Sequence, residues 1–160
     1  MREPETFAIA SDLAAPAARV WADVTRPEGV NDELMPLLRM TFPGAPEGFT
    51  LDGAPTDRVL CHCWLLAFGV LPYDRHALKL ARVEPGRGFV EASTSWTQRL
   101  WRHERSIEPL GASSCRVRDA LTFAPRMPLP RRVVRSAVEV VFVHRHGRLR
   151  RRYGESGASA

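Results

Sequence analysis

The sequence predicts one α+β domain in which a curved antiparallel sheet wraps a long C-terminal helix. Three observations support this fold class: a first strand followed by two short helices, a series of strand-like runs separated by turn residues, and a long helical segment at the end. A chain of 160 residues suits a single domain. We expect this domain to span residues 1–154 and to be followed by a disordered tail over residues 155–160.

The first part of the chain supplies one strand and two helices. Residues 7–13 alternate loosely between apolar and polar side chains, which is typical of a strand. Residues 16–25 open with proline and place Trp21 beside two valines, which predicts a helix that packs this ring inward. A second helix is predicted over residues 27–38, with Pro36 as its kink or its end.

The middle of the chain alternates strand-like runs with turn chemistry. Turns rich in glycine, proline, aspartate and serine are predicted at residues 44–48, 52–57, 84–88 and 109–114. The runs between them predict an antiparallel meander, because loops of this length join neighbouring strands. These runs are residues 58–68, 73–83, 88–96, 99–107 and 115–125, with 40–42 as a further short strand.

The last segment is predicted to be one long helix, residues 131–153, after prolines that break the sheet. Its residues advance by about 100° each, which places one broad arc of the helix inward. This arc comprises Val133, Val134, Ala137, Val138, Val140, Val141, His144, Arg145 and Arg148. His144 is therefore predicted to continue the core stripe beside Val141, whereas His146 is predicted to face solvent. His144 is the better site candidate, either as a ligand contact or as a structurally satisfied core histidine. The arginines that follow need no partner, because the helix C-terminus favours cations by roughly 0.3–1 kcal/mol each.

Composition restricts the class of protein. With 44% hydrophobic and 26% charged residues, the chain contains no apolar run of the roughly 18 residues that cross a bilayer. The first residues are acidic and polar, unlike a secretory signal, so we expect a cytoplasmic protein. The cysteines, Cys61, Cys63 and Cys115, are odd in number and scattered, which favours reduced thiols over a disulfide framework.

Polar residues share faces with apolar ones on the last two predicted strands, because strand side chains alternate. Asp119 is in phase with apolar neighbours, and His103 and Arg105 are in phase with Trp101. A buried unpaired charge is costly, so Asp119 and Arg105 should bind each other or a polar group of a ligand. His103 near a carboxylate could also perform general acid/base chemistry.

Further inward candidates come from the other strands. His76 is in phase with two leucines, whereas the run that contains Glu91 supports either phase, so the face of Glu91 stays open. The indole rings of Trp64, Trp96 and Trp101 either pack in the core or line an apolar pocket. We expect at least one of these rings to reach a cavity.

Several phrases, together with the element order, carry a resemblance to a known superfamily. They are APAARVWADVT (15–25), LLAFGVLPYDRHAL (65–78), WRHERSI (101–107) and FVHRHGRLRRRYG (142–154). The sequence resembles the START/Bet v 1-like (SRPBCC) superfamily over nearly its whole length, in particular a bacterial subgroup of ligand-binding or cyclase/dehydrase-like proteins. The resemblance implies the helix-grip fold and a cavity between the sheet and the long helix, which in relatives holds lipids, sterols, polyketides, plant hormones or aromatic products. It carries no catalytic signature onto particular residues.

These observations lead to three functional hypotheses. The first is binding of a small hydrophobic or amphipathic ligand in the internal cavity, and the second is a polyketide aromatase/cyclase-type enzyme that uses the same cavity. The third is binding of an acidic partner by the basic C-terminal helix. The candidate cavity residues are His76, Glu91, Trp64, Trp96, Trp101, His103, Arg105, Asp119, Val141 and His144.

Other partners and cofactors are not expected. Cys61, His62 and Cys63 with His76 lack the usual spacing of a zinc site. The motifs of serine hydrolases, P-loop NTPases and dinucleotide enzymes do not occur in the sequence. A nucleic-acid partner is not expected either, because the arginine run lacks the accompanying exposed aromatics or a known nucleic-acid motif.

Overall fold

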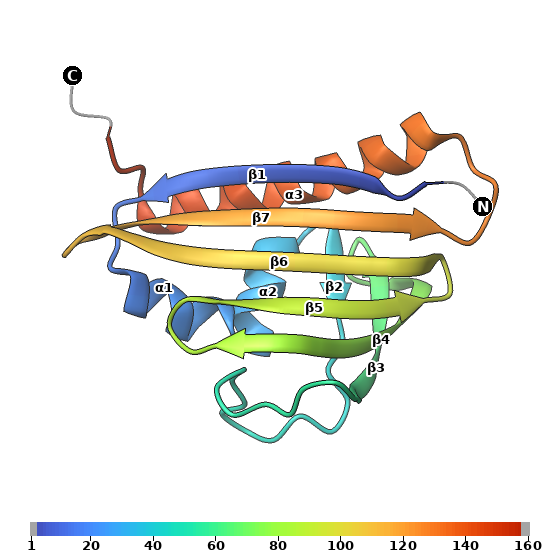
Figure 1. The fold of residues 1–160 in the computed structure, drawn as a ribbon, viewed down its shortest axis with the longest axis horizontal. Helices are drawn as coiled ribbons and strands as arrows, with labels where there is room; N and C mark the ends of the chain where they lie inside the picture. Colours follow the sequence, from blue (N-terminus) through green and yellow to red (C-terminus); the bar gives the residue numbers. More distant parts are fainter. Residues whose placement is uncertain (1–2, 158–160) are drawn as a thin grey trace.

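A computed structural model describes residues 3–157 and shows a curved sheet packed against one long helix (Figure 1). The helices are α1 (Ala17–Val24), α2 (Pro27–Leu34) and α3 (Arg131–Tyr153). The strands are β1 (Glu5–Leu13), β2 (Leu38–Met40), β3 (Val59–Ala67), β4 (Leu71–Glu84), β5 (Gly88–Ser95), β6 (Gln98–Gly111) and β7 (Ser114–Pro125). The predicted α+β helix-grip fold is confirmed.

Sheet topology follows the predicted meander. Within residues 3–157 the strand order is β1-β7-β6-β5-β4-β3-β2, and neighbouring strands run antiparallel. The first strand closes one edge by pairing with the last, which places Ile9 beside Asp119 and Asp119 beside Arg105 in the ladder. Residues far apart in sequence therefore meet on the concave face of the sheet.

The end of α2 differs from the prediction. The helix stops at Leu34 rather than at residue 38, because Pro36 disfavours helical geometry at the residue before it. The residues after Pro36 form β2, two positions earlier than the predicted strand at 40–42. Asn31 secures this connection, because its side chain hydrogen-bonds both the backbone N–H (2.8 Å) and the carbonyl oxygen (2.9 Å) of Met40.

The apolar core divides into two clusters along α3. We call the first the closed end, where α1 and the C-terminal half of α3 cover β6 and β7 (Figure 1). Its buried residues are Leu13, Ala15, Val20, Trp21, Val24, Ile107, Cys115, Val117, Leu149 and Tyr153. We call the second the cavity end, where Leu121 and Phe123 of β7 pack under Val134, Val138 and Phe142 of the N-terminal half of α3.

The buried stripe of α3 agrees with the predicted arc only in part, at Val134, Val138 and Arg145. Val133 and Val140, predicted to face inward, are 59% and 58% exposed. His146, predicted to face solvent, is completely buried, whereas His144 is partly exposed and its Nε2 lies 2.9 Å from the carbonyl oxygen of Met35. The predicted arc already included Arg145, which pairs with the Glu33 carboxylate, but it left out His146, which is buried because the Asp119 carboxylate pairs with it.

The arginines at the end of α3 contact their own chain. Arg148 donates to the carbonyl oxygen of Asp32, and Arg152 donates to the Asp32 carboxylate, both at 2.9 Å. Arg150 pairs with Glu155, which forms an isolated antiparallel bridge with Leu13. Of the tail predicted to be disordered, residues 155–157 are described, and Glu155 pairs with Leu13 of β1. Residues 158–160 lie outside the described part of the chain.

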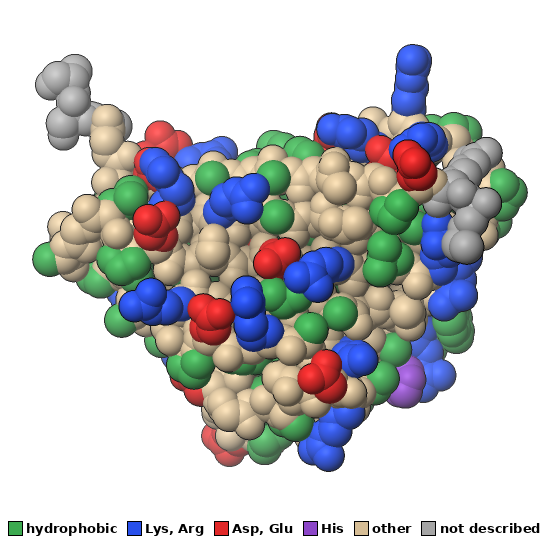
Figure 2. Space-filling model, viewed as in Figure 1, with side chains coloured by type: hydrophobic (Ala, Val, Ile, Leu, Met, Phe, Trp, Pro, Cys, Tyr) green, Lys and Arg blue, Asp and Glu red, His purple; other side chains and the backbone are tan. Residues whose placement is uncertain are grey.

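The outer face of the sheet carries interspersed acidic, basic and apolar side chains (Figure 2). No helix within residues 3–157 is both long and apolar enough to cross a membrane.

Candidate functional site

A cavity of about 410 Å³ lies between the concave face of the sheet and α3. Its walls come from α2, β4, β5, β6, α3 and the segment that precedes β3, and they are largely apolar. Leu34, Phe42, Leu78 and Val138 are typical lining residues. The volume falls within the range of about 300–1,000 Å³ that is usual for small-molecule pockets.

One wall of the cavity is charged. His76 of β4 hydrogen-bonds Glu91 of β5 through Nε2 and Oε1, and the hydroxyl of Ser93 donates to the same oxygen at 2.7 Å. Nδ1 of His103 on β6 lies 3.7 Å from the other oxygen of Glu91. His76, Glu91 and His103 all line the cavity, so the carboxylate is placed between two imidazole rings beside an otherwise apolar space.

The charge state of this wall follows from its contacts. Burial favours a raised pKa for Glu91, but the charge of His76 and hydrogen bonds from His103 and His76 hold it below its usual range. Burial likewise opposes protonation of His76, yet the Glu91 carboxylate raises the pKa of His76 above its ordinary value. His76 therefore keeps its proton to a higher pH than an ordinary histidine does.

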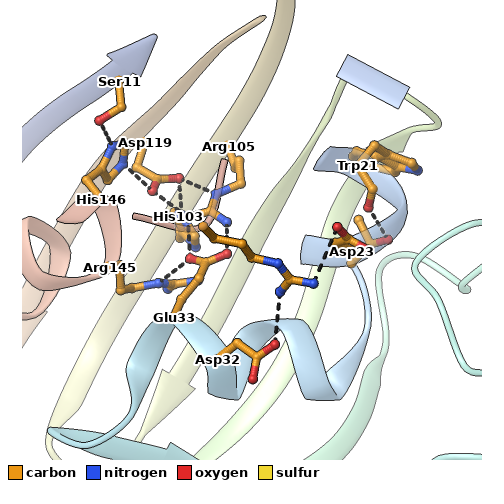
Figure 3. A network of polar contacts seen from close by, with 12 residues as sticks. Ser11, Trp21, Asp23, Asp32, Glu33, His103, Arg105, Asp119, Arg145 and His146 are labelled. Carbon is orange, nitrogen blue, oxygen red and sulfur yellow. Dashed lines mark hydrogen bonds and ion pairs between the residues drawn. The ribbon is translucent and has the colours of Figure 1, made fainter. Parts of the chain in front are cut away.

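Behind His103 lies a buried ionic network (Figure 3). Arg105 of β6 donates two hydrogen bonds of 2.7 Å to Asp119 of β7 and two more, of 2.7 and 2.9 Å, to Glu33 of α2. Arg145 of α3 donates to Glu33 at 2.9 Å. His103 Nε2 lies 2.8 Å from Asp119. The network thus joins β6, β7, α2 and α3.

The network pairs two carboxylates with two arginines and is excluded from water. Asp119, Arg105 and Glu33 are 0%, 2% and 2% exposed. Burial favours a raised pKa for both carboxyls, but Arg105 and His103 hold the pKa of Asp119 well below its usual range. Arg105 and Arg145 likewise lower the pKa of Glu33. Of the two predicted alternatives for Arg105, the structure shows the pair with Asp119. Asp119 also contacts Nε2 of His103, which leaves the rest of that ring on the cavity side.

On its far side the network ends in a serine–histidine–aspartate series. His146 places Nε2 2.9 Å from Asp119 and Nδ1 2.9 Å from the hydroxyl of Ser11. Arg150 donates to the same hydroxyl oxygen at 2.9 Å. Because the ionised Asp119 carboxylate can only accept, His146 carries a proton on Nε2 and donates it to Asp119. None of Ser11, His146 and Asp119 lines the cavity, so this series supports the fold.

A second polar group of the cavity wall surrounds Asp74 near the turn between β5 and β6. Asp74 accepts hydrogen bonds of 2.7 Å from the hydroxyls of Ser95 and Thr97. Burial, assisted by the charge of Asp74, raises the pKa of Tyr73 to about 12, so this phenol is neutral and can donate. All four residues line the cavity.

A family model covers most of this chain. Residues 11–153 match the model described as a domain of unknown function, DUF8410. The chain belongs to the DUF8410 family. A search of curated proteins found no match.

Solved structures of other proteins share the fold of the DUF8410 chain. A START superfamily protein from Mycobacterium smegmatis superposes with a TM-score of 0.68 at 15% identity, over 92% of this chain and 96% of that one. The Zhui aromatase/cyclase from a Streptomyces species gives 0.65 at 14% identity, over 91% of each chain. Ara h 8.0201 gives 0.57 at 12% identity, over 91% and 97%. The DUF8410 chain has the fold of the START/Bet v 1-like superfamily.

Half of the predicted site residues line the cavity of the DUF8410 domain. Alternation along the strands correctly placed His76 and His103, and the open phase of β5 resolves with Glu91 inward. The tryptophan that reaches the cavity is Trp101. The predicted residues that line the cavity are His76, Glu91, Trp101, His103 and Val141.

The other predicted site residues lie elsewhere. Arg105 and Asp119 lie behind the wall in the ionic network, and His144 contacts α2 instead of the cavity. Trp64 and Trp96 pack edge to face, with ring centroids 5.1 Å apart, and are 36% and 60% exposed. Trp64 points outward because it lies between the inward-facing Cys63 and Leu65 of β3.

Sequence reasoning missed Glu33 and His146 as members of the polar core, and it placed Arg145 on the inward arc without its partner. Glu33 follows the apolar Val30 by three residues and so shares its face of α2, which was an available signal. A carboxylate within an apolar stripe needs a cationic partner, but α2 offers none on that face. The partner comes from β6, which only the tertiary structure brings close.

Proposed function

We propose that this protein binds a small hydrophobic or amphipathic molecule in the cavity between the sheet and α3. The observation that carries the proposal is a largely apolar cavity of about 410 Å³ with one charged wall, built by His76, Glu91 and His103. The apolar lining would provide most of the affinity, and the charged wall would orient one polar end of the ligand.

The hydrogen-bonding capacity of the wall favours ligands with accepting oxygens. The Glu91 carboxylate already accepts hydrogen bonds from His76 and Ser93. The Asp74 carboxylate likewise accepts hydrogen bonds from Ser95 and Thr97. His76, which keeps its proton to a higher pH than an ordinary histidine, and the neutral Tyr73 supply donors at the cavity surface. A carbonyl or phenolic oxygen on an apolar skeleton matches this pattern better than an ammonium group does.

Native mass spectrometry of freshly purified protein, compared with its denatured mass, tests for a bound molecule. A matched pair of variants on α3 then locates the site with the fluorescent probe anilinonaphthalene sulfonate. Val141→Trp fills the cavity, whereas Val143→Trp changes a side chain that is 52% exposed. We expect the first variant to weaken probe binding about tenfold or more, equivalent to about 1.4 kcal/mol, and the second to leave it unchanged. Equal affinities for both variants would count against the cavity.

A second candidate function is a cyclase of the polyketide aromatase/cyclase type. The observation that favours it is the His76–Glu91 ion pair at the cavity surface, where the imidazolium could act as a general acid toward a carbonyl oxygen. In such an aldol cyclisation, a carbon between two carbonyls loses a proton to a base and bonds to a distant carbonyl carbon, whose oxygen takes up the proton of His76. The resulting hydroxyl then leaves as water together with the second proton of the attacking carbon, and a C=C bond forms.

A synthetic poly-β-ketone thioester tests this activity. Turnover would appear as a product lighter by one water, and His76→Gln should slow it about a hundredfold or more. His144→Gln is the matched control because His144 does not line the cavity. Absence of product with the wild-type protein, or equal rates for both variants, would leave ligand binding as the function.

A further inference from the structure

Two cysteines of β3 lie in direct contact on the inner side of the sheet. Cys61 and Cys63 are separated by one residue, and their sulfur atoms are 3.0 Å apart. Cys63 is completely buried and pairs with His76 in the ladder, whereas Cys61 is partly exposed next to an irregularity in the pairing of β3 with β4. This cluster lies outside the residues that line the cavity.

The two thiols differ in reactivity. A hydrogen bond from Cys63 lowers the pKa of Cys61 to about 7, with burial opposing this effect and the charge of His76 assisting it. The same hydrogen bond, together with burial, raises the pKa of Cys63 above its ordinary value. A partly exposed thiol that ionises near neutral pH therefore contacts one thiol that stays protonated.

We propose that Cys61 and Cys63 form a modification site that is oxidised by hydroperoxides to an intramolecular disulfide. The Cys61 thiolate attacks the peroxide, so that an S–O bond forms, the O–O bond breaks and hydroxide leaves to take up a proton as water. Cys63 then attacks the Cys61 sulfenic acid, so that the S–S bond forms, the S–O bond breaks and a second water carries away the Cys63 proton. The dithiol loses two electrons, and the peroxide gains them.

The bond requires a local bend of β3. Residues two apart in an extended strand are separated by about 6.6 Å between Cα atoms, and their parallel side chains leave the Cβ atoms about as far apart. A disulfide accepts this Cα separation but needs Cβ atoms about 3.5–4.5 Å apart, so the strand must bend to bring the two side chains together. The irregularity in the pairing of β3 with β4 between Val59 and Cys61 lies beside the place where this bend is needed. This site is independent of the proposed ligand-binding function.

Peptide mass analysis of the wild-type protein provides the direct test. Trypsin cuts after Arg58 and Arg75, so both cysteines fall in the single peptide 59–75, whereas Cys115 falls in a different peptide. After one equivalent of hydrogen peroxide and alkylation of the remaining thiols, we expect peptide 59–75 to lose two hydrogens and to escape alkylation, reversibly with a reductant. Alkylation of Cys61 and Cys63 to the same extent as before peroxide would overturn the proposal.

Variants separate the roles of the two sulfurs. Cys63→Ser keeps a hydroxyl donor beside Cys61, so Cys61 should still react near pH 7 but stop at a sulfenic acid that dimedone traps. Cys61→Ser should react at least tenfold more slowly, whereas Cys115→Ser should behave like the wild type. Equal peroxide rates for Cys61→Ser and the wild-type protein would contradict the assignment, and the wild-type peptide measurement stands even if a variant folds poorly.

Discussion

The closed end and the cavity end of the molecule use the same α3 helix in opposite ways. At the closed end, Leu149 and Tyr153 are buried against α1 and the sheet. At the cavity end, Val134, Val138 and Phe142 contact β7 on one side and border the cavity on the other. One end therefore stabilises the fold by close packing, and the other leaves apolar surface available inside the protein.

Two buried carboxylates, one behind the cavity wall and one on it, make a similar contrast. Asp119 is fully buried and makes its hydrogen bonds with Arg105, His103 and His146, away from the cavity. Glu91 also contacts histidines but lies at the cavity surface. Similar residue types thus have structural roles behind the wall and candidate functional roles on it, and access to the cavity distinguishes the two.

The largest expected effect comes from breaking the buried network. Arg105→Leu leaves Glu33 and Asp119 without their shared cation, and we expect a loss of about 3–5 kcal/mol in the free energy of unfolding, measured with urea. Arg116→Leu is the matched control, because it removes the exposed pair with Asp12 and should leave the unfolding midpoint nearly unchanged. A similar loss in both variants would show that burial does not set the strength of these pairs.

A smaller effect should separate packed leucines from cavity leucines. Leu149→Ala at the closed end removes a side chain that is 1% exposed, and we expect it to cost about 2–5 kcal/mol in unfolding free energy. Leu78→Ala changes a partly buried side chain that already borders the cavity, so its cost should be clearly lower. Urea unfolding of both variants checks this difference, and equal costs would mean that the cavity end packs as tightly as the closed end.

The smallest effect concerns pH. The pKa of His76 is raised in the folded protein, so its stabilising contribution is complete below the unfolded value near 6.5 and is lost as pH rises through the folded value. The wild type should therefore lose more stability above about pH 6.5 than His76→Gln does, by about 1.4 kcal/mol for each unit of pKa elevation. Parallel pH profiles of the two proteins in urea unfolding would show that the ion pair with Glu91 does not contribute.

Local pattern was a good guide for the strands. Alternation placed Asp119, His103, Arg105 and His76 on the inward face before any tertiary contact was known, because period two leaves only two choices per strand. The strand of Glu91 was ambiguous because serines, a threonine and the carboxylate occupy both faces. Its phase is set by contacts with His76 and His103 from the neighbouring strands.

The sequence by itself determined the order of elements, the meander and the long final helix, since turns, prolines and hydrophobic periods act over a few residues. Only the tertiary structure decided which stripe of α3 is buried. His146 replaced His144 in the core because Asp119 and Ser11 are there to bind it, and Glu33 is buried because Arg105 and Arg145 neutralise it. Burial of a charged or polar side chain depends on partners from distant segments, and no local period records where those partners will lie.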